Sequence, residues 1–289
     1  MSAPKIKTTK NKENELPEGS TREGWRASID LTLAGTKTGK TVVSYAKHVG
    51  PLRIQRPFYP EGDTPHLYLL HPPGGFVAGD ELTVNVNVRE NAGVLVTTPG
   101  ASKVYRSLGD TSSVSNHIKV DGTLEWFPQE TILFDQSRFS SQTTLHFGAQ
   151  GRGFVWDIVC LGRPAGEFLY EKGNATLILS LETDQKLSFV DTLRLDPQSK
   201  MAKAFWGLKG QCVIGTMIAY PGDETLCQQT QLVLEDLPDT ELTLLNNVLV
   251  VRALGTQAWD VRERFVRVWQ TLRPLLLDRP VSIPRIWNT

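Results

Sequence analysis

Apolar and polar residues alternate with a period of two along much of the first 200 residues. The alternation is clearest over residues 26–33 and 82–88. A strand places successive side chains on opposite faces, so this pattern predicts half-buried β-strands. Gly, Pro, Asn and Asp interrupt the segments at short intervals, and no long helical repeat separates them, which argues against βαβ units. Further segments of this kind are 67–70, 94–98, 124–127, 143–147, 154–159 and 175–181.

The C-terminal third has a different pattern. Residues 224–234 are compatible with a short helix, and residues 248–252 with another strand. Residues 259–277 predict the clearest helix, because large apolar side chains recur there at spacings of three and four. Pro274 is expected to kink or end it. The whole pattern predicts a mainly β protein with elongated, stacked or coiled antiparallel β-sheets and a few helices, mostly in the C-terminal third.

The polar N-terminal segment differs from the rest of the chain. Residues 1–22 are rich in Lys, Glu, Asn and Thr and offer little to bury, so we expect a disordered tail there. Order is expected to begin near Trp25. No linker divides the remainder, so residues 23–289 are interpreted as a single β-rich domain.

The composition excludes several classes of protein. The 289 residues carry 31 Lys and Arg against 31 Asp and Glu, which argues against a nucleic-acid partner. Cys160, Cys212 and Cys227 form neither a disulfide framework nor a zinc-finger spacing. The N-terminus lacks the apolar core of a secretory signal, and no stretch approaches the roughly 20 apolar residues of a membrane span. We therefore expect a cytoplasmic protein without a membrane partner.

Three segments could carry chemistry. The Gly- and Pro-rich run 71–81 lacks the GxxxxGK[ST] pattern and precedes a strand, so a tight loop is favoured over a nucleotide site. Ser102 next to Lys103 leaves a hydrolase open, although adjacent strand residues point to opposite faces. Glu125 and Glu130 could form an acid–base pair, but their spacing does not fix their separation. A strand end is favoured for the Ser102 segment, and surface or ion-paired carboxylates are favoured for Glu125 and Glu130.

Several of these segments together resemble the UreD (UreH) family of urease accessory proteins. The resemblance runs from about Gly24 to Trp287, and its motifs are specific only in combination. They are residues 48–60, 71–80, 99–107, 124–134, 156–157 and 161–164.

The resemblance implies a protein without catalytic activity that supports urease maturation. It implies binding to UreF, to the GTPase UreG through UreF, and to the urease apoprotein. Family members are thought to let nickel pass through a polar internal passage, so no tightly bound cofactor is expected, only nickel in transit. A structural adaptor of the same complex, with no metal-carrying role, stays open as the alternative.

Five residues match positions that we associate with this passage: Asp80, Glu81, Ser102, Asp157 and Asp191. Oxygen ligands suit rapid transfer, since a nanomolar site loaded at about 10⁷ M⁻¹s⁻¹ would release at only about 0.01 s⁻¹. The alternative for each is a polar group satisfied by hydrogen bonds within the fold.

Two further features have open roles. His71 and Cys160 are alternative nickel ligands, although a loop-packing imidazole and a small buried hydrophobe are favoured. The C-terminal helix and residues 284–287 are apolar enough to join a partner interface. Packing on the domain's own sheet is the alternative for both.

Overall fold

A computed structural model describes residues 24–163, 166, 168–183 and 186–288. The tail predicted over residues 1–22 lies outside the described residues. Among the described residues, no helix combines the length and apolar character needed to cross a membrane.

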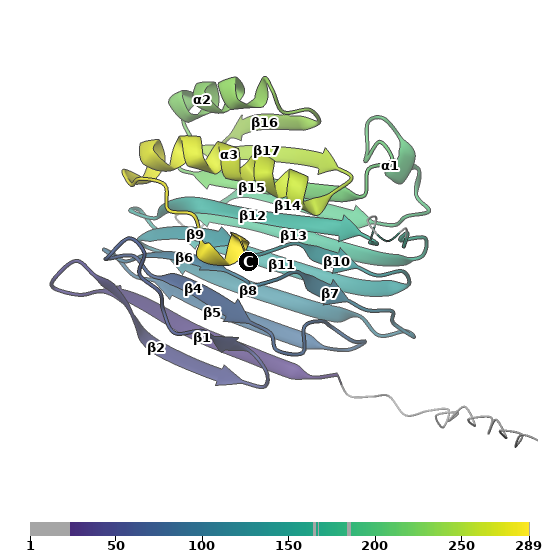
Figure 1. Ribbon diagram of the computed structural model, residues 1–289, viewed down its shortest axis with the longest axis horizontal. Helices are drawn as coiled ribbons and strands as arrows, with labels where there is room; N and C mark the ends of the chain where they lie inside the picture. The colour runs from purple at the N-terminus through teal and green to yellow at the C-terminus, as the bar shows by residue number, and fades with distance from the viewer. Residues whose placement is uncertain (1–23, 164–165, 167, 184–185, 289) are drawn as a thin grey trace, which may run out of the picture.

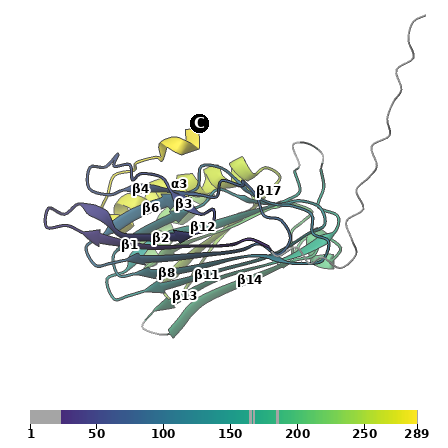
Figure 2. The ribbon, with the colours of Figure 1, turned by 90° about the horizontal axis from the view of Figure 1, so that it is seen from below.

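Two β-sheets face each other across an apolar gap (Figures 1 and 2). The first has the order β14 (Lys186–Leu195), β13 (Gly173–Thr183), β11 (Ser137–Phe147), β8 (Ser112–Val120), β5 (Glu81–Val88), β1 (Arg26–Gly35) and β2 (Thr41–Val49). The second has the order β16 (Thr240–Leu245), β17 (Val248–Gly255), β15 (Val213–Tyr220), β12 (Arg152–Leu161), β9 (Thr123–Phe127), β6 (Gly93–Thr97), β4 (His66–Leu70) and β3 (Arg53–Ile54), with β7 (Ser102–Val104) and β10 (Thr131–Leu133) attached beside β12.

The chain coils between the two sheets, so the central strands of each sheet are parallel. From β4 to β13 it crosses repeatedly between the sheets, staying in the ten-stranded sheet only from β6 to β7 and from β9 to β10. As a result β5, β8, β11 and β13 are parallel neighbours, and so are β4, β6, β9 and β12. Antiparallel pairing is found toward the edges of both sheets. The pairs are β1–β2 and β13–β14 in the first sheet, and β3–β4, β12–β15, β15–β17 and β16–β17 in the second. The prediction of a mainly β fold is confirmed, whereas the predicted antiparallel direction holds only for these outer strands. Alternation identifies the buried face of a strand but not the direction of its neighbour.

The apolar positions fill two layers. On β5, Leu82, Val84, Val86 and Val88 all point into the gap between the sheets and are buried. A second apolar layer separates the ten-stranded sheet from α2 (Glu224–Leu234) and α3 (Ala258–Leu277), which cover its outer face (Figure 1). A one-turn helix, α1 (Lys200–Lys203), and a 3-10 turn, η2 (Arg285–Asn288), complete the elements.

Both helices predicted for the C-terminal third are confirmed, and α3 runs through Pro274 to Leu277. The sequence pattern did not predict strands β2, β3, β8, β10, β14, β15 and β16. In β15, seven consecutive residues are buried because the sheet is covered on both faces there, so no alternation marks the strand. In β2 most positions are exposed, so it lacks the apolar half of the pattern.

A buried ion cluster fixes α3 to the sheet. The Arg273 guanidinium donates to Glu125 on β9 at 2.8 and 3.0 Å and to both Glu61 oxygens at 2.9 and 2.8 Å. The Trp269 indole N–H also donates to Glu125, at 2.6 Å, and His66 lies 3.0 Å from Glu61. The side chains of Arg273 and Glu125 are 0% and 1% exposed. The cluster therefore joins three segments that are distant in sequence, with its charges paired away from water.

Removing Arg273 is expected to destabilise the protein strongly. Arg273→Ala leaves Glu125 and Glu61 buried without their guanidinium, with only the Trp269 and His66 contacts, so the free energy of unfolding should fall by about 3–5 kcal/mol. The control is Arg279→Ala, whose partner Asp63 is well exposed. That change should cost no more than about 1 kcal/mol. Urea denaturation followed by tryptophan fluorescence measures both values, and similar small losses would contradict the structural role assigned to the cluster.

Candidate functional site

A cavity of about 270 Å³ lies in the gap between the sheets. Its wall is mostly apolar, with contributions from Leu82, Val84 and Trp126. Some polar side chains, such as Asn116 and Thr143, enter it from inward strand positions, and others come from loops. Those polar lining residues are His71, Thr98, Ser102, Asn116, Gln129, Thr131, Ser141, Thr143 and Asp157.

Asp157 is the only Asp or Glu among the described residues that line this cavity. It lies on β12 between Val155 and Val159, whose side chains belong to the inter-sheet core. Burial raises the pKa of Asp157 to about 6; a backbone hydrogen bond from Ile158 opposes the rise, and the charge of Asp191 adds to it. An ionised carboxylate is thus held where its charge is poorly solvated.

A second, smaller cavity connects Asp157 to Asp191. It measures about 20 Å³, and both carboxylates and Thr216 line it. Thr216 lies opposite Asp157 in the β12–β15 ladder and donates its hydroxyl hydrogen to Asp191 at 3.2 Å. Asp191 also pairs with the Arg252 guanidinium at 3.1 Å, and the Arg252 side chain is 56% exposed. The polar positions therefore continue from the main cavity to a solvent-accessible arginine on β17.

Ser102 and His71 line the main cavity on another side. The Ser102 backbone N–H donates to the Glu130 carbonyl at 2.9 Å, which sets the start of β7 beside β10. The His71 ring packs 5.2 Å from the Phe76 ring. Burial lowers the pKa of His71, although the charge of Asp80 acts in the opposite direction. The neutral imidazole is therefore the favoured form at pH 7, and it can offer a lone pair.

Asp80 and Glu81 lie outside this cavity. The buried Asp80 carboxylate accepts hydrogen bonds from the backbone N–H groups of Trp25 and Val77, both at 2.9 Å. It therefore ties the start of β1 to the loop before β5. Glu81 is exposed and pairs with Arg26 across the parallel β1–β5 ladder at 3.4 Å. Of the five residues predicted from the sequence, the structure brings Ser102, Asp157 and Asp191 to the two cavities, and it gives Asp80 and Glu81 local partners elsewhere.

The geometry does not support the hydrolase interpretations. Among the described residues, no basic side chain is hydrogen-bonded to the Ser102 hydroxyl, and Lys103 is exposed. Glu125 faces the helix layer in the ion cluster, whereas Glu130 lies 3.9 Å from Arg262. The two carboxylates are thus engaged with different arginines of α3 and do not form an acid–base pair.

Cys160 is also an unfavourable ligand. Burial raises the pKa of its thiol to about 12, and it packs in the helix layer rather than in the cavity. No group of three or more His, Cys, Asp or Glu side chains is arranged to hold a metal ion in the part of the chain that the structure describes.

Comparison with known proteins identifies the family. The family model described as "UreD urease accessory protein" matches residues 26–288. The chain belongs to the UreD family of urease accessory proteins. Proteins named urease accessory protein UreD from Alcanivorax borkumensis and Klebsiella aerogenes are 40% and 38% identical over 276 and 275 residues. These alignments cover 92% and 93% of this chain, and 93% and 98% of the relatives.

Membership of this family has a direct consequence for the chemistry. The chain is a urease accessory protein and not an enzyme. The resemblance noted over residues 24–287 is confirmed by the matched range.

Sequence reasoning missed several polar lining residues. Asn116 on β8 donates its side-chain N–H to the Thr143 hydroxyl on β11 at 2.9 Å, so both are satisfied within the wall. The sequence pattern could have indicated Asn116 as a lining residue. It occupies an inward position of the series Val114–Asn116–Ile118, where an apolar residue is expected. Polar residues at inward positions of such a series could have been collected as candidates.

The raised pKa of Asp157 predicts a pH-dependent stability. The folded protein retains the Asp157 proton up to a pH of about 6, whereas the unfolded chain loses it near pH 4, so stability falls as pH rises through this window. Asp157→Asn mimics the protonated form and should be more stable than the wild type by about 1–3 kcal/mol at pH 7.5, with the difference vanishing near pH 4. Urea denaturation across this range measures it.

The control for this prediction is Glu90→Gln, which neutralises an exposed carboxylate in the turn before β6. Its effect on the unfolding free energy should be small at every pH. A wild type that is as stable as Asp157→Asn at pH 7.5 would show that Asp157 is not held in an unfavourable environment.

Proposed function

We propose that this chain is a cytoplasmic urease maturation factor that acts as both a scaffold and a nickel conduit. It binds UreF, contacts UreG through UreF, and docks on the urease apoprotein, so that nickel reaches the urease active site. The observation that carries the conduit is the single carboxylate, Asp157, in the inter-sheet cavity, with Asp191 beyond it. Family membership supports the accessory role.

The electrostatics of the cavity favour a transient cation. The pKa of Asp157 is about 6, so the carboxylate is mostly ionised at neutral pH. A divalent cation next to it would offset the cost of burying that charge, and this gives the cation a reason to enter. The other polar groups are hydroxyls, amides and the imidazole of His71. Hydroxyl and amide oxygens are weak ligands for nickel, so the metal would be held loosely and could move on.

Arg252 lies at the solvent end of the polar positions that run from Asp157 to Asp191. Its guanidinium pairs with Asp191 and reaches solvent, so it occupies the place that a cation beside Asp191 would take. An ion pair that is partly solvated is worth only about 1 kcal/mol or less, so an arriving divalent cation can displace it. In this proposal Asp191 exchanges Arg252 for nickel during transfer.

A second candidate function is a structural adaptor that binds the same partners without carrying metal. The observation that favours it is the width of the connection between Asp157 and Asp191. The cavity there measures about 20 Å³, which is room for about one water molecule. In the adaptor case the carboxylates would serve the fold alone.

The accessory role is tested in cells that contain the urease subunits and the other accessory proteins. Omitting this chain should give urease with little nickel and little activity, and restoring it should recover both. The measurement is nickel per urease active site, together with urease activity. Normal maturation without the chain would contradict the proposed function.

The conduit is tested with Asp157→Asn and Asp191→Asn in the same cells. Loss of a ligand interaction worth about 1.4 kcal/mol should lower the rate of nickel transfer about tenfold, while the complex with UreF and urease still assembles. Asp157→Asn is expected to be more stable than the wild type, so misfolding would not explain its loss of activity.

The matched control is Asp30→Asn, which changes an aspartate on the outer face of the seven-stranded sheet, hydrogen-bonded to Asn85. It should leave nickel transfer unchanged. Full nickel content in both cavity variants, with intact complexes, would support the adaptor and exclude the conduit.

A further inference from the structure

An exposed aromatic loop joins the two sheets at one end of the molecule. Residues 199–211, here called the aromatic loop, contain α1 and connect β14 to β15 (Figure 1). Phe205 and Trp206 at its tip are 83% and 67% exposed. Two adjacent exposed aromatic side chains form an apolar patch of the kind found at partner-binding sites.

The loop is rigidly built. Its own backbone closes it with hydrogen bonds such as Leu208 N–H to Met201 C=O at 2.9 Å and Gly210 N–H to Ala202 C=O at 2.9 Å. Gly207 approaches Met201 so closely that a Cβ atom would lie 2.2 Å from the Met201 carbonyl oxygen. Leu208 is buried in the inter-sheet core and anchors the loop from below. The aromatic side chains are thus presented by a preorganised support, which lowers the entropy cost of binding.

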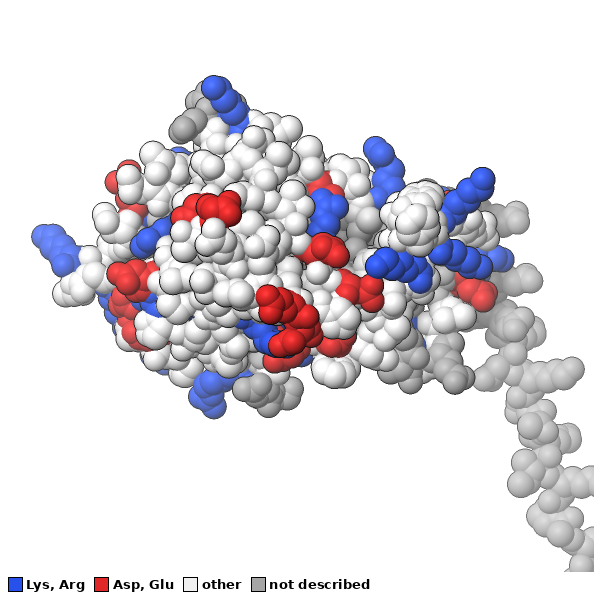
Figure 3. Space-filling view, turned by 90° about the horizontal axis from the view of Figure 1, so that it is seen from above, with Lys and Arg blue, Asp and Glu red and all other residues white. Residues whose placement is uncertain are grey.

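The charged residues within the loop itself are all basic. No Asp or Glu occurs between Asp196 and Asp223, whereas Lys200, Lys203 and Lys209 lie on or beside the loop. Lys209 pairs with Asp239 at 2.8 Å. Lys200 and Lys203 are exposed, and no ion pair is found for either among the described residues. Figure 3 shows several basic side chains around uncharged surface at this end, with a few acidic ones beside them. The two exposed lysines without an ion pair fit an acidic partner.

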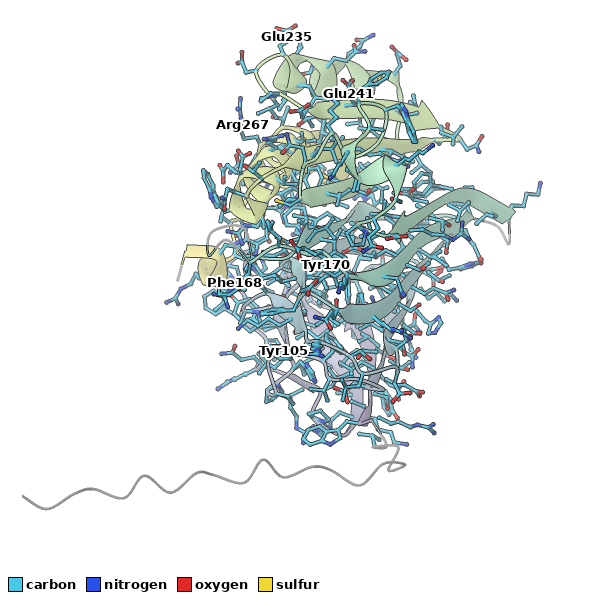
Figure 4. The ribbon with its side chains drawn as sticks, turned by 90° about the vertical axis from the view of Figure 1, so that its right-hand side faces the viewer. Tyr105, Phe168, Tyr170, Glu235, Glu241 and Arg267 are labelled. Carbon is cyan, nitrogen blue, oxygen red and sulfur yellow. The ribbon has the colours of Figure 1, made fainter. Side chains whose placement is uncertain are left out.

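The same end carries further exposed aromatic residues. Tyr105 packs 5.1 Å from Phe134, and the Arg163 guanidinium lies 5.0 Å from the Phe168 ring. These side chains line a groove of about 630 Å³. Tyr105 and Phe168 are labelled in Figure 4, which looks onto this end. Tyr, Trp and Arg are the residue types enriched at the energetic centres of protein interfaces.

We infer that the aromatic loop is the anchor by which this chain docks a protein partner that offers an apolar pocket within an acidic surface. This rests on the proposed function, because such a partner would sit beside the strands that carry Asp191 and Thr216. Membrane attachment is disfavoured because polybasic membrane segments carry about 4–8 Lys or Arg, and only two unpaired lysines are available on this loop.

The test measures binding of the full-length protein to purified urease apoprotein and, separately, to purified UreF. Phe205→Ser/Trp206→Ser should weaken binding to one of them about 30-fold or more. Lys200→Glu/Lys203→Glu should weaken the same complex, and wild-type affinity for that partner should fall as salt rises. All replaced side chains are exposed, so unfolding midpoints should not change.

Two matched controls lie on the opposite edge of the seven-stranded sheet. Tyr45→Ser removes an exposed aromatic from β2, and Lys37→Glu/Lys47→Glu reverses two exposed lysines on and near that strand. Both should bind like the wild type. If the aromatic-loop variants bind both partners like the wild type, or if they lose only binding to anionic phospholipid vesicles, the docking assignment is overturned. Absence of wild-type binding to either protein would contradict the proposed function as well.

Discussion

The salt bridges of Arg273 hold together parts of the chain that are far apart in sequence. Arg273 on α3 reaches Glu125 on β9 and Glu61 in the segment before β4. Burying these charges is tolerated because nearly all of their hydrogen-bonding capacity is used inside the cluster. With α3 fixed in this way, the outer face of the ten-stranded sheet is sealed by Phe265, Trp269 and their neighbours. The sheet is then covered on both faces.

Two buried carboxylates on adjacent strands lie on opposite faces of the ten-stranded sheet and have different roles. Glu125 on β9 faces the helices and is fully paired, so its role is structural. Asp157 on β12 faces the gap between the sheets, where burial raises its pKa to about 6. An apolar residue would fit the inter-sheet core better at that position. Local conflict with the packing rules is expected where function constrains a residue, and the conflict at Asp157 is the physical basis of the proposed conduit.

The coiled topology relates this cavity to the surface proposed for docking. Because the chain passes from sheet to sheet, its connections close the ends of the gap, and the aromatic loop is one of these connections. Its buried Leu208 belongs to the same core as the cavity wall, whereas Phe205 and Trp206 point to solvent. A partner bound there would lie next to β14 and β15, which carry Asp191 and Thr216. Docking and transfer would then use neighbouring parts of one structure.

The sequence by itself determined the mainly β class, the helices over 224–234 and 259–277, and the family, because periodicity and motifs are local properties. It also identified Asp157 as a polar residue within an apolar strand. Only the tertiary structure decided that the central strands are parallel, since alternation contains no information on direction. It likewise decided that Asp80 ties Trp25 to Val77, that Glu125 serves Arg273, and that Asn116 and Thr143 join Asp157 at one cavity. Those outcomes depend on which distant strands become neighbours, and that is settled by the joint packing of both sheets and α3.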